Sequence, residues 1–370
     1  MTIGVLKEPT SEARVSVLPE AVIALIKTGH RVLVEQGAGE AAFASDDEYQ
    51  KAGAELVTRE EIWQADCLLG IQHPENMPIG QLNEKILIGI YQPLFQKILM
   101  EQWASAGITS FSLDMLPRTT RAQSMDVLSS QANIAGYKSV LLAAATYPRY
   151  FPLFMTAAGS IAPARVLVLG AGVAGLQAIA TARRLGAVVE VFDTRPAVKE
   201  EVKSLGAKFI EVEGAADPGQ AGGYAVEQTD EFKRRQQQKI AESIAKADIV
   251  ITTAQIPGKA APVLVLDSML DAMREGSVIV DLAAATGGNT TKTENNKTIR
   301  YKGLTIIGNS NLAATLPSDA SKLYGKNIRQ FLALITSDAG SIKLNWEDDL
   351  VKGACITHGK VLVHERVKTL

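Results

Sequence analysis

Residues 164–193 read ARVLVLGAGVAGLQAIATARRLGAVVEVFD, and this stretch determines the fold of the second half of the chain. An apolar strand enters a glycine-rich turn, an amphipathic helix follows, and a second apolar strand ends at Asp193. The glycines have the spacing Gly-x-Gly-x-x-Gly, which in this strand–turn–helix context is typical of dinucleotide-binding units. The sequence therefore predicts a dinucleotide site.

Each glycine of this turn has a predicted task. Gly170 permits a tight turn out of the strand, Gly172 lets the backbone approach a pyrophosphate, and Gly175 lets the helix pack closely on the sheet. The N–H groups and the dipole at the start of the helix would face the phosphates. We assign the pyrophosphate to Gly170, Gly172, Val173, Ala174 and Gly175.

The residues after the second strand bear on which dinucleotide is bound. Asp193 lies roughly 20 residues beyond the glycines, where a carboxylate hydrogen-bonds the ribose hydroxyls and repels a 2′-phosphate. This position favours NAD(H) over NADP(H). Thr194 and Arg195 follow, and Arg195 argues the other way because an arginine here can accommodate a 2′-phosphate.

Composition limits the classes of function. A chain of 370 residues suits two domains, and a net charge of −2 gives no electrostatic reason to expect nucleic acid or an anionic membrane as a partner. The sequence has no run of 18 apolar residues and opens on an apolar strand, so we expect a cytoplasmic protein without its own membrane insertion. Cys67 and Cys355 lack metal-ligand spacing, and we expect buried thiols and no metal site.

Apolar runs alternate with helical segments throughout the chain, which predicts two doubly wound parallel sheets of the Rossmann type. In the N-terminal region we expect helices over residues 19–30, 46–57 and 95–107, with strands between them. A small-residue helix over 129–147 then leads to about six strands, the last over 304–309.

A further helix over 320–335 is long enough to cross back to the first domain. We therefore expect a discontinuous N-terminal domain, residues 1–128 plus 318–370, and an NAD(H)-binding domain over residues 129–317. The ligand is expected in the cleft between the two domains, near the carboxyl ends of the central strands.

Other residues of the second domain are weaker candidates. Thr252, Thr253 and Ala254 end a predicted strand and would line the cofactor cleft, although threonines are also common in strands for packing reasons. Asp281 and Asn309 lie at comparable strand ends. Residues 213–231 form an unusually long connection that contains Tyr224, and we interpret it as a lid over the nucleotide; a plain surface loop is the alternative.

Four segments resemble one known family: GAGVAGLQAIATARRLGAVVEVFDTRP (170–196), GGYA (222–225), VDLAAATGGN (280–289) and PRTTRAQSMDVLSSQANIAGYKSV (117–140). They are similar to the NAD(H)-binding first domain of proton-translocating nicotinamide nucleotide transhydrogenase. The resemblance covers nearly the whole chain, and its most specific segment is residues 118–129, which generic Rossmann proteins lack.

The resemblance implies that this loop reaches over the nicotinamide, with roles for Arg118, Gln123, Asp126 and Ser129. Their chemistry is compatible with such roles, because an amide can hold the carboxamide while Arg118 and Asp126 can pair. The alternative is a charged surface turn in which Asp126 caps the helix that follows.

Alanine dehydrogenase shares the architecture and is the competing interpretation. KEPTSEARVSVLPE (7–20) is similar to its opening motif, and Arg14 matches the arginine that holds the substrate carboxylate there. The other matches fail: Gln72, Pro93 and Ala285 stand where that enzyme has a lysine, a histidine and an aspartate. His73 is a conceivable substitute, but a structural role is the simpler interpretation.

These departures favour a reaction that needs no general acid or base. Oxidation of an amino acid requires proton transfers, whereas hydride transfer between two nicotinamides requires mainly that the rings be held in register. The resemblance further implies an NADP(H)-binding domain and membrane-spanning subunits as partners, a homodimer, and a peripheral location on the cytoplasmic face of the inner membrane. An amino-acid dehydrogenase and a silent NAD(H)-binding module remain as alternatives.

Overall fold

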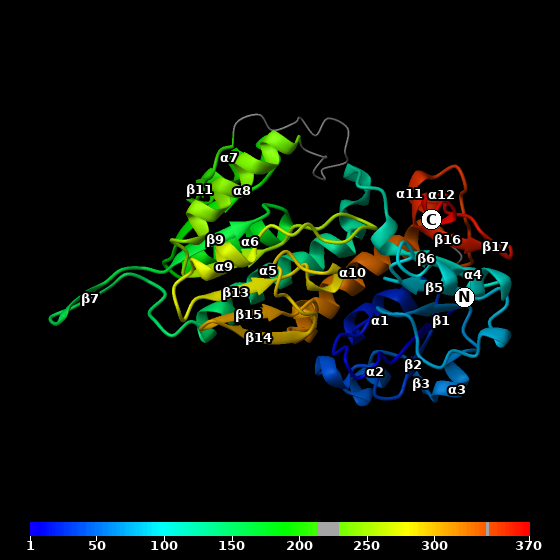
Figure 1. Cartoon of the computed structure of the whole chain (residues 1–370). Helices are drawn as coiled ribbons and strands as arrows, with labels where there is room; N and C mark the ends of the chain where they lie inside the picture. The colour runs from blue at the N-terminus through cyan, green and yellow to red at the C-terminus, as the bar shows by residue number, and fades with distance from the viewer. Residues whose placement is uncertain (213–228, 338–339) are drawn as a thin grey trace. The chain divides into compact units, whose positions relative to one another are not determined.

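The computed structural model describes residues 1–212, 229–337 and 340–370, and it divides the chain into two compact units. The first unit comprises Met1–Gln131 with Ala314–Leu370, and the second comprises Ala132–Ala313. Each unit is built on a mainly parallel sheet flanked by helices (Figure 1). The predicted α/β fold class with two Rossmann-like sheets is confirmed. Tyr224 and most of the proposed lid lie outside the described residues.

The described portion of the first unit contains an eight-stranded sheet in the order β17-β16-β6-β5-β4-β1-β2-β3. Its first six strands along the chain are parallel and follow the Rossmann order 3-2-1-4-5-6. Their bounds are β1 (Thr2–Val5), β2 (Arg31–Glu35), β3 (Glu55–Val57), β4 (Cys67–Leu69), β5 (Ile86–Gly89) and β6 (Thr109–Ser112). The C-terminal strands β16 (Cys355–His358) and β17 (Val361–Leu362) extend the sheet in antiparallel sense.

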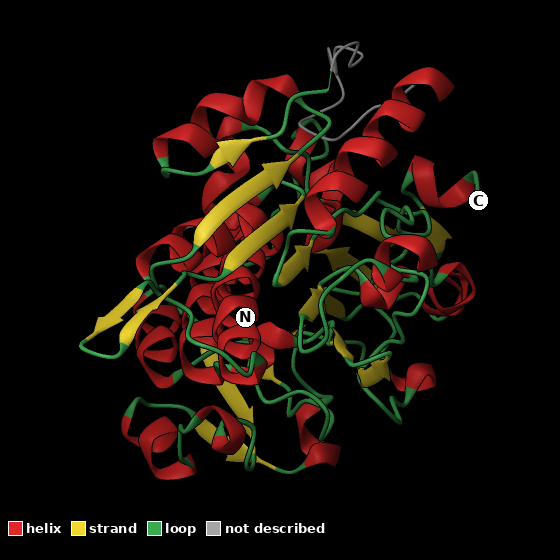
Figure 2. Ribbon diagram, turned by 60° about the vertical axis from the view of Figure 1, so that its left-hand side comes forward, coloured by secondary structure: helices red, strands yellow, loops and turns green. Residues whose placement is uncertain are grey.

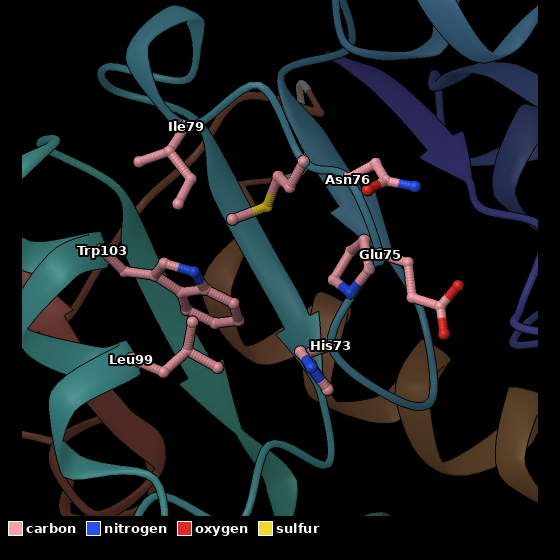
Figure 3. A pocket seen from close by; sticks show the side chains of 8 residues that line it. His73, Glu75, Asn76, Ile79, Leu99 and Trp103 are labelled. Atoms are coloured by element: carbon pink, nitrogen blue, oxygen red, sulfur yellow. The ribbon is translucent and has the colours of Figure 1, made fainter.

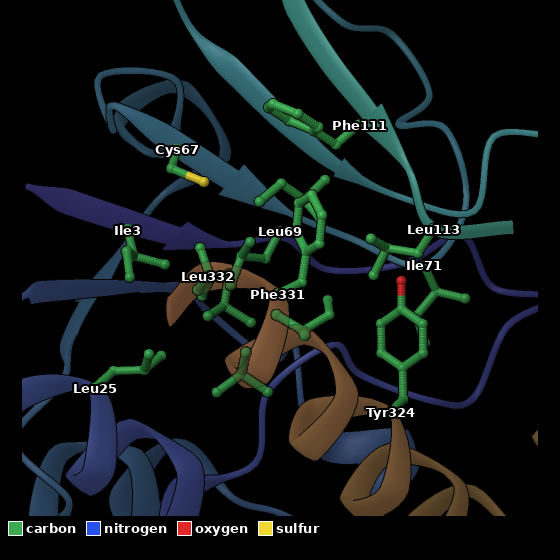
Figure 4. Packing of buried hydrophobic residues seen from close by; sticks show 14 of the residues in the cluster. Ile3, Leu25, Cys67, Leu69, Ile71, Phe111, Leu113, Tyr324, Phe331 and Leu332 are labelled. Carbon is green, nitrogen blue, oxygen red and sulfur yellow. The ribbon is translucent and has the colours of Figure 1, made fainter. Parts of the chain in front are cut away.

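The helices of the first unit are α1 (Pro19–Lys27), α2 (Asp46–Lys51), α3 (Arg59–Ile62), α4 (Lys97–Ser105), α10 (Pro317–Ile335), α11 (Asp349–Ala354) and α12 (Glu365–Lys368). Helix α10 presses Tyr324, Phe331 and Leu332 into the core formed by the strands (Figure 4). The rings of Phe331 and Phe111 meet edge to face with centroids 5.2 Å apart. The returning C-terminal segment therefore completes the core of this unit.

Both cysteines are buried in this first unit, as expected. Burial raises the pKa of Cys355 to about 12 and raises the pKa of Cys67 as well, so both remain thiols at neutral pH.

The helix predicted over residues 46–57 is too long, and its second half is a strand. A capping box between Ser45 and Glu48 starts α2, but the helix ends at Lys51. Gly53 has a φ of +94°, which breaks the helix, and the chain then enters β3, which pairs with β2. The apolar residues that extend the helical pattern belong to this edge strand.

The described portion of the second unit contains a seven-stranded sheet in the order β11-β10-β9-β12-β13-β15-β14. The six predicted strands are present and parallel, again in Rossmann order: β9 (Arg165–Leu169), β10 (Val188–Phe192), β11 (Lys208–Phe209), β12 (Ile249–Thr252), β13 (Val278–Asp281) and β15 (Leu304–Gly308). The seventh, β14 (Lys297–Tyr301), is an antiparallel edge strand that was not predicted.

The longer helices of the second unit are α6 (Val173–Arg184) and α8 (Asp230–Ile244), and α7 (Lys199–Ser204) and α9 (Asp267–Asp271) are shorter. Helix α5 (Val127–Thr146) begins at the end of the first unit and continues into the second. It corresponds closely to the small-residue helix predicted over 129–147.

An antiparallel hairpin, β7 (Phe154–Thr156) and β8 (Gly159–Ile161), leaves the second unit as an arm that the sequence pattern did not indicate (Figures 1 and 2). All six of its strand residues are exposed. None of the helices in the described residues has both the length and the apolar character needed to cross a membrane.

Candidate functional site

The glycine turn of the second unit, the candidate nucleotide site, lies where the strand order reverses, between β9 and β12. In open α/β sheets, ligands bind outside the carboxyl ends of the strands at this switch point. The turn that begins at Gly170 follows β9, and Thr253 follows the neighbouring strand β12. The topology therefore brings the two sequence-predicted segments together.

The three glycines of the turn have distinct geometries. Gly170 has a φ of +105°, a conformation that L side chains rarely adopt. A Cβ on Gly175 would lie 1.8 Å from the carbonyl oxygen of Gly170, so only glycine allows α6 to approach the strand end. A Cβ on Gly172 would meet no described heavy atom within 4 Å, which leaves room for a ligand beside the backbone.

The first turn of α6 suits an anionic group. Its N-cap is Gly172, and no side chain of the described residues caps the N-terminal N–H groups. Val173 is exposed and Ala174 is half-buried at this end of the helix. Uncapped N–H groups at a helix N-terminus are a ready site for phosphate, so these residues fit the pyrophosphate of a dinucleotide.

Helix α5 supports this turn through a glycine that the sequence analysis missed. A Cβ on Gly136 would lie 2.1 Å from the carbonyl oxygen of Ala174, so α5 packs directly against the start of α6. The glycine lies within an otherwise regular helical pattern, and such an isolated glycine is a signal of close packing.

Asp193 connects the glycine turn to the residues that follow β10. Its Oδ2 accepts the Ala171 N–H at 2.7 Å, and its two oxygens also accept the Arg195 backbone N–H at 2.8 Å, Nε at 2.9 Å and Nη2 at 2.8 Å. The Asp193 side chain is only 6% exposed, and the bond to this carboxylate raises the pKa of Arg195. Thr194, between them, is half-buried.

In this arrangement Arg195 occupies much of the hydrogen-bonding capacity of Asp193. A carboxylate accepts about four hydrogen bonds, and four N–H donors converge on these two oxygens. Ribose hydroxyls could reach Asp193 only if Arg195 gave up some of its contacts. The arginine is therefore positioned to compete for the carboxylate that the sequence pattern assigns to the ribose.

The threonines that end β12 have different surroundings. Thr252 is fully buried, and its hydroxyl finds no hydrogen-bond partner among the described residues. The Thr253 hydroxyl instead donates to the carbonyl oxygen of Gly170 at 3.1 Å, directly at the glycine turn. Of the two, Thr253 is the one that contacts the glycine turn.

Ala254 is held by a residue that the sequence analysis did not single out. The buried Asn289 accepts the Ala254 N–H at 3.0 Å and donates to the Ala254 carbonyl oxygen at 2.9 Å. Asn289 in turn is fixed by Asp281, which accepts its backbone N–H at 2.6 Å. Its place after two glycines in VDLAAATGGN is a weak signal for such a turn.

Asp281 is fully buried and organises the loop after β13. It also accepts the Ala283 N–H at 2.9 Å and the Thr293 hydroxyl at 2.6 Å. Asn309 accepts the Asn311 N–H at 2.8 Å and lines a cavity of about 290 Å³ beside Lys297 and Arg300. The structure thus gives Asp281 a loop-forming role, separate from the glycine turn.

The loop over residues 118–129 belongs to the first unit. Thr120–Met125 form a 3₁₀ helix, η4, in which Ala122 and Met125 are buried. Gln123 and Arg118 are exposed, whereas Asp126 and Ser129 are half-buried. Asp126 accepts the Ser129 backbone N–H at 2.9 Å and the Ser129 hydroxyl at 2.5 Å, so it caps α5 as the alternative interpretation expected.

Arg14 lies in a buried polar cluster near the switch point of the first unit. It donates to Glu12 through Nη2 at 2.6 Å and Nε at 2.8 Å, and to the Gln131 side chain through Nη1 at 2.7 Å. The Gln72 side chain donates to Glu12 at 3.1 Å. Arg14 and Gln72 are therefore brought together, but as a hydrogen-bonded arginine–amide cluster.

Glu8 lies beside this cluster and has a pKa near neutrality. Burial raises its pKa from 4.5 to about 7. Its two oxygens accept the backbone N–H groups of Ile71 at 2.6 Å and Gln72 at 3.1 Å. The carboxyl is thus engaged in holding the loop after β4.

Pro93 is buried and Ala285 is exposed, and neither side chain can transfer a proton.

His73 is exposed and lines a cavity of about 430 Å³ (Figure 3). Apolar side chains of Ile79, Leu99 and Trp103 line this cavity, and the Glu75 carboxylate points away from the indole. Its lining is therefore mostly apolar and does not pair His73 with an acid.

The two sheets in Rossmann order and the glycine turn after β9 define a two-domain Rossmann protein. Comparison with known proteins identifies its family. The sequence matches the descriptions "Alanine dehydrogenase/PNT, N-terminal domain" over residues 4–135 and "Alanine dehydrogenase/PNT, C-terminal domain" over residues 139–365. The chain belongs to the alanine dehydrogenase/PNT family.

Within this family the chain is more similar to transhydrogenase alpha subunits than to alanine dehydrogenases. It is 43% identical to an NAD(P) transhydrogenase subunit alpha polypeptide of Rhodospirillum rubrum, over 98% of each chain. The crystal structure of transhydrogenase from Sinorhizobium meliloti matches with a TM-score of 0.86 and 43% identity over 99% of each chain. An L-alanine dehydrogenase structure matches with a TM-score of 0.82 and 26% identity, over 100% of this chain and 98% of that one. The predicted resemblance is confirmed.

Proposed function

We propose that this chain is the NAD(H)-binding subunit of a proton-translocating NAD(P) transhydrogenase. Hydride passes directly between NAD(H) held by this chain and NADP(H) held by a partner domain, and membrane-spanning subunits couple the exchange to proton translocation. The observation that carries the proposal is the glycine turn, where an open Gly172 and an uncapped helix start lie beside Asp193.

NAD(H) would be held by the second unit. The pyrophosphate would lie against the N–H groups at Gly172–Gly175, and the adenosine ribose would lie at Asp193. Thr253 and Asn289 keep the neighbouring strand end in register with this turn through their bonds to Gly170 and Ala254. The cofactor supplies the redox chemistry, and the protein supplies orientation.

The loop over residues 118–129 would position the nicotinamide. Gln123 is exposed on a 3₁₀ helix whose neighbours Ala122 and Met125 are anchored in the core. An amide presented from a rigid element can hold the carboxamide of the ring, with Arg118, Asp126 and Ser129 shaping the same loop. Direct hydride transfer demands this control of distance and orientation.

The alanine-dehydrogenase-like activity lacks support in the chemistry of the first unit. The positions that would carry its lysine and histidine hold Gln72 and Pro93, and Gln72 is engaged with Glu12. An amide and a proline cannot move protons at a reacting carbon, whereas hydride exchange between two nicotinamides asks for no such step.

The partners follow from the same proposal. The proposed partners are an NADP(H)-binding domain, which would dock on this chain, and membrane-spanning transhydrogenase subunits, which would keep the protein peripheral on the cytoplasmic face. We further propose a homodimer, because the exposed arm of β7 and β8 presents Leu153 and Met155, which are 56% and 75% exposed.

The test is to mix this chain with a purified transhydrogenase NADP(H)-binding domain and to follow the reduction of an NAD⁺ analogue by NADPH. Turnover in the mixture, with none from either component alone, is the expected result. No turnover despite measured NADH binding, together with oxidation of alanine to pyruvate and ammonia, would establish the alanine-dehydrogenase-like alternative.

A further inference from the structure

The loop that carries Gln123 is braced by the C-terminal segment of the chain. Arg121 of η4 donates through Nη2 to Asp348 and, at 2.7 Å, to Oδ1 of Asp349. Asp349 is the first residue of α11 and Asp348 is its N-cap, whose side chain also accepts the Leu350 N–H at 2.9 Å. A single guanidinium thus joins η4 to the start of a helix more than 220 residues further along.

Two more contacts hold the same loop. Asn327 of α10, which is 8% exposed, donates through Nδ2 to the carbonyl oxygen of Ser124 at 2.8 Å. A Cβ on Gly353 would lie 2.4 Å from Pro117 Cγ, so α11 packs directly against the residue before Arg118. The loop is therefore fixed on both sides of Gln123 while its amide remains exposed.

The ion pair of Arg121 contributes too little to the stability of the unit to explain its presence. Arg121 is 53% exposed and Asp349 is 63% exposed, and ion pairs at such exposure contribute little to folding. Asp348 is only 8% exposed, so one end of the contact is fixed in place. A partly exposed arginine on a fixed acceptor sets where η4 lies rather than how tightly the unit folds.

We infer that Arg121, through Asp348 and Asp349, and Asn327 are positioning residues that hold Gln123 for hydride transfer. The inference rests on the proposed function. It makes α11 and α10 components of the reaction machinery, although neither carries a residue assigned to the nucleotide. Displacement of a positioning group by about 1 Å lowers a reaction rate by roughly 100-fold, which sets the scale of the expected effect.

The test measures two quantities for each variant: the NADH dissociation constant, and the single-turnover rate of hydride transfer with the NADP(H)-binding domain present. Arg121→Ala should lower the rate about 10- to 100-fold and leave NADH affinity within about twofold. Arg121→Lys should recover some of the rate, because it keeps the charge but not the forked donor. Asn327→Ala should act in the same direction.

Arg31→Ala is the matched control. Arg31 pairs with Glu55 in the same unit, at 59% and 52% exposure, and lies on β2 rather than near the loop. It should leave rate and affinity unchanged, and the melting temperatures of the two alanine variants should agree.

The outcomes separate the two claims. A normal rate for Arg121→Ala, in an assay where Gln123→Asn is slow, would overturn the positioning role and leave the proposed function intact. A normal rate for Gln123→Asn would instead remove the loop from the reaction. Loss of rate that follows a loss of thermal stability in proportion, with no recovery in Arg121→Lys, would also reject the inference.

Discussion

Asp193 is a shared acceptor rather than a free carboxylate. Since Arg195 and the Ala171 N–H use its acceptor capacity, the proposed binding of the ribose at Asp193 would require the Arg195 side chain to move. The arginine that argued for NADP(H) in the sequence is, in the structure, a partner of the residue that argues for NAD(H). We therefore expect nucleotide specificity at this site to depend on the Asp193–Arg195 pair.

This coupling predicts opposite changes at the two positions. Asp193→Ala should weaken NADH by about tenfold and NADPH by less, because only NADH loses a ribose acceptor without a relief of repulsion. Arg195→Ala should increase the affinity for NADH and decrease the affinity for NADPH. Titrations of both nucleotides against each variant measure this, and equal losses for the two nucleotides in Asp193→Ala would show that the carboxylate does not discriminate.

Glu8 gives a pH-dependent contribution to stability. Its pKa is about 7 in the folded protein and 4.5 without burial, so the folded state binds the proton more tightly. The resulting stabilisation is complete below pH 4.5 and is lost as the pH rises through 7, at most about 3 kcal/mol in total.

Denaturant unfolding at several values from pH 5 to pH 8 tests this assignment. The Glu8 contribution makes the free energy of unfolding fall with rising pH, so its slope against pH should be more negative in the wild type than in Glu8→Gln, whatever that variant loses overall. The opposite contribution of His30 and His364, whose pKa values are lowered by burial, is common to both proteins. Parallel pH profiles for the two proteins would mean that another group carries the dependence.

The glycine turn predicts a contrast between two neighbouring substitutions. Gly175→Ala would drive a Cβ to 1.8 Å from the Gly170 oxygen, and displacement of α6 should cost roughly 1–3 kcal/mol of stability. Gly172→Ala meets open space at a φ of −76°, so it should cost less, no more than about 1 kcal/mol, because alanine is a poorer N-cap residue than glycine.

The main effect of Gly172→Ala should be a lower affinity for NADH, because the new methyl group would occupy the space assigned to the pyrophosphate. Thermal melts and NADH titrations of both variants separate the two effects. Normal NADH affinity in Gly172→Ala would place the pyrophosphate elsewhere.

Most helices and strands could be predicted from the sequence because they are encoded by local patterns of apolar and polar residues. Buried parallel strands are continuous apolar runs, and these runs predicted all six parallel strands of the second unit. The exceptions have non-local causes. Strand β14, whose sequence KTIRY contains no fully buried residue, forms because it pairs with β15 at the edge of the sheet. The β7–β8 arm has no buried face, so it leaves no apolar pattern in the sequence.

The same distinction holds for the site. The glycines and Asp193 form a contiguous pattern, so the sequence could assign them tasks. Three supporting residues act through distant partners: Asn289, Gly136 and Asn327 contact residues 35, 38 and 203 positions away. The sequence around each of them does not indicate which residue it contacts. Arg121 likewise looks like a surface charge until α11 is placed beside it.

In the intact molecule, the exposed arm predicts the oligomeric state. If β7 and β8 clasp a second copy, replacing Leu153 and Met155 together by aspartate should convert a dimer to a monomer, because buried charges would oppose association. Ile98→Asp is the control, since Ile98 is 74% exposed on α4 of the other unit. Sedimentation velocity distinguishes the species, and a dimer that survives the double change would remove the arm from the interface.

Direct transfer of hydride between two nicotinamides is the central step of the proposed function. The measurement that tests it most directly uses NADPH carrying deuterium at the transferred C4 position, an NAD⁺ analogue, this chain and an NADP(H)-binding domain. We predict that the deuterium appears at C4 of the reduced analogue with no hydrogen taken from solvent. Solvent hydrogen at that carbon, or a reduced analogue formed without this chain, would contradict direct hydride transfer by this protein.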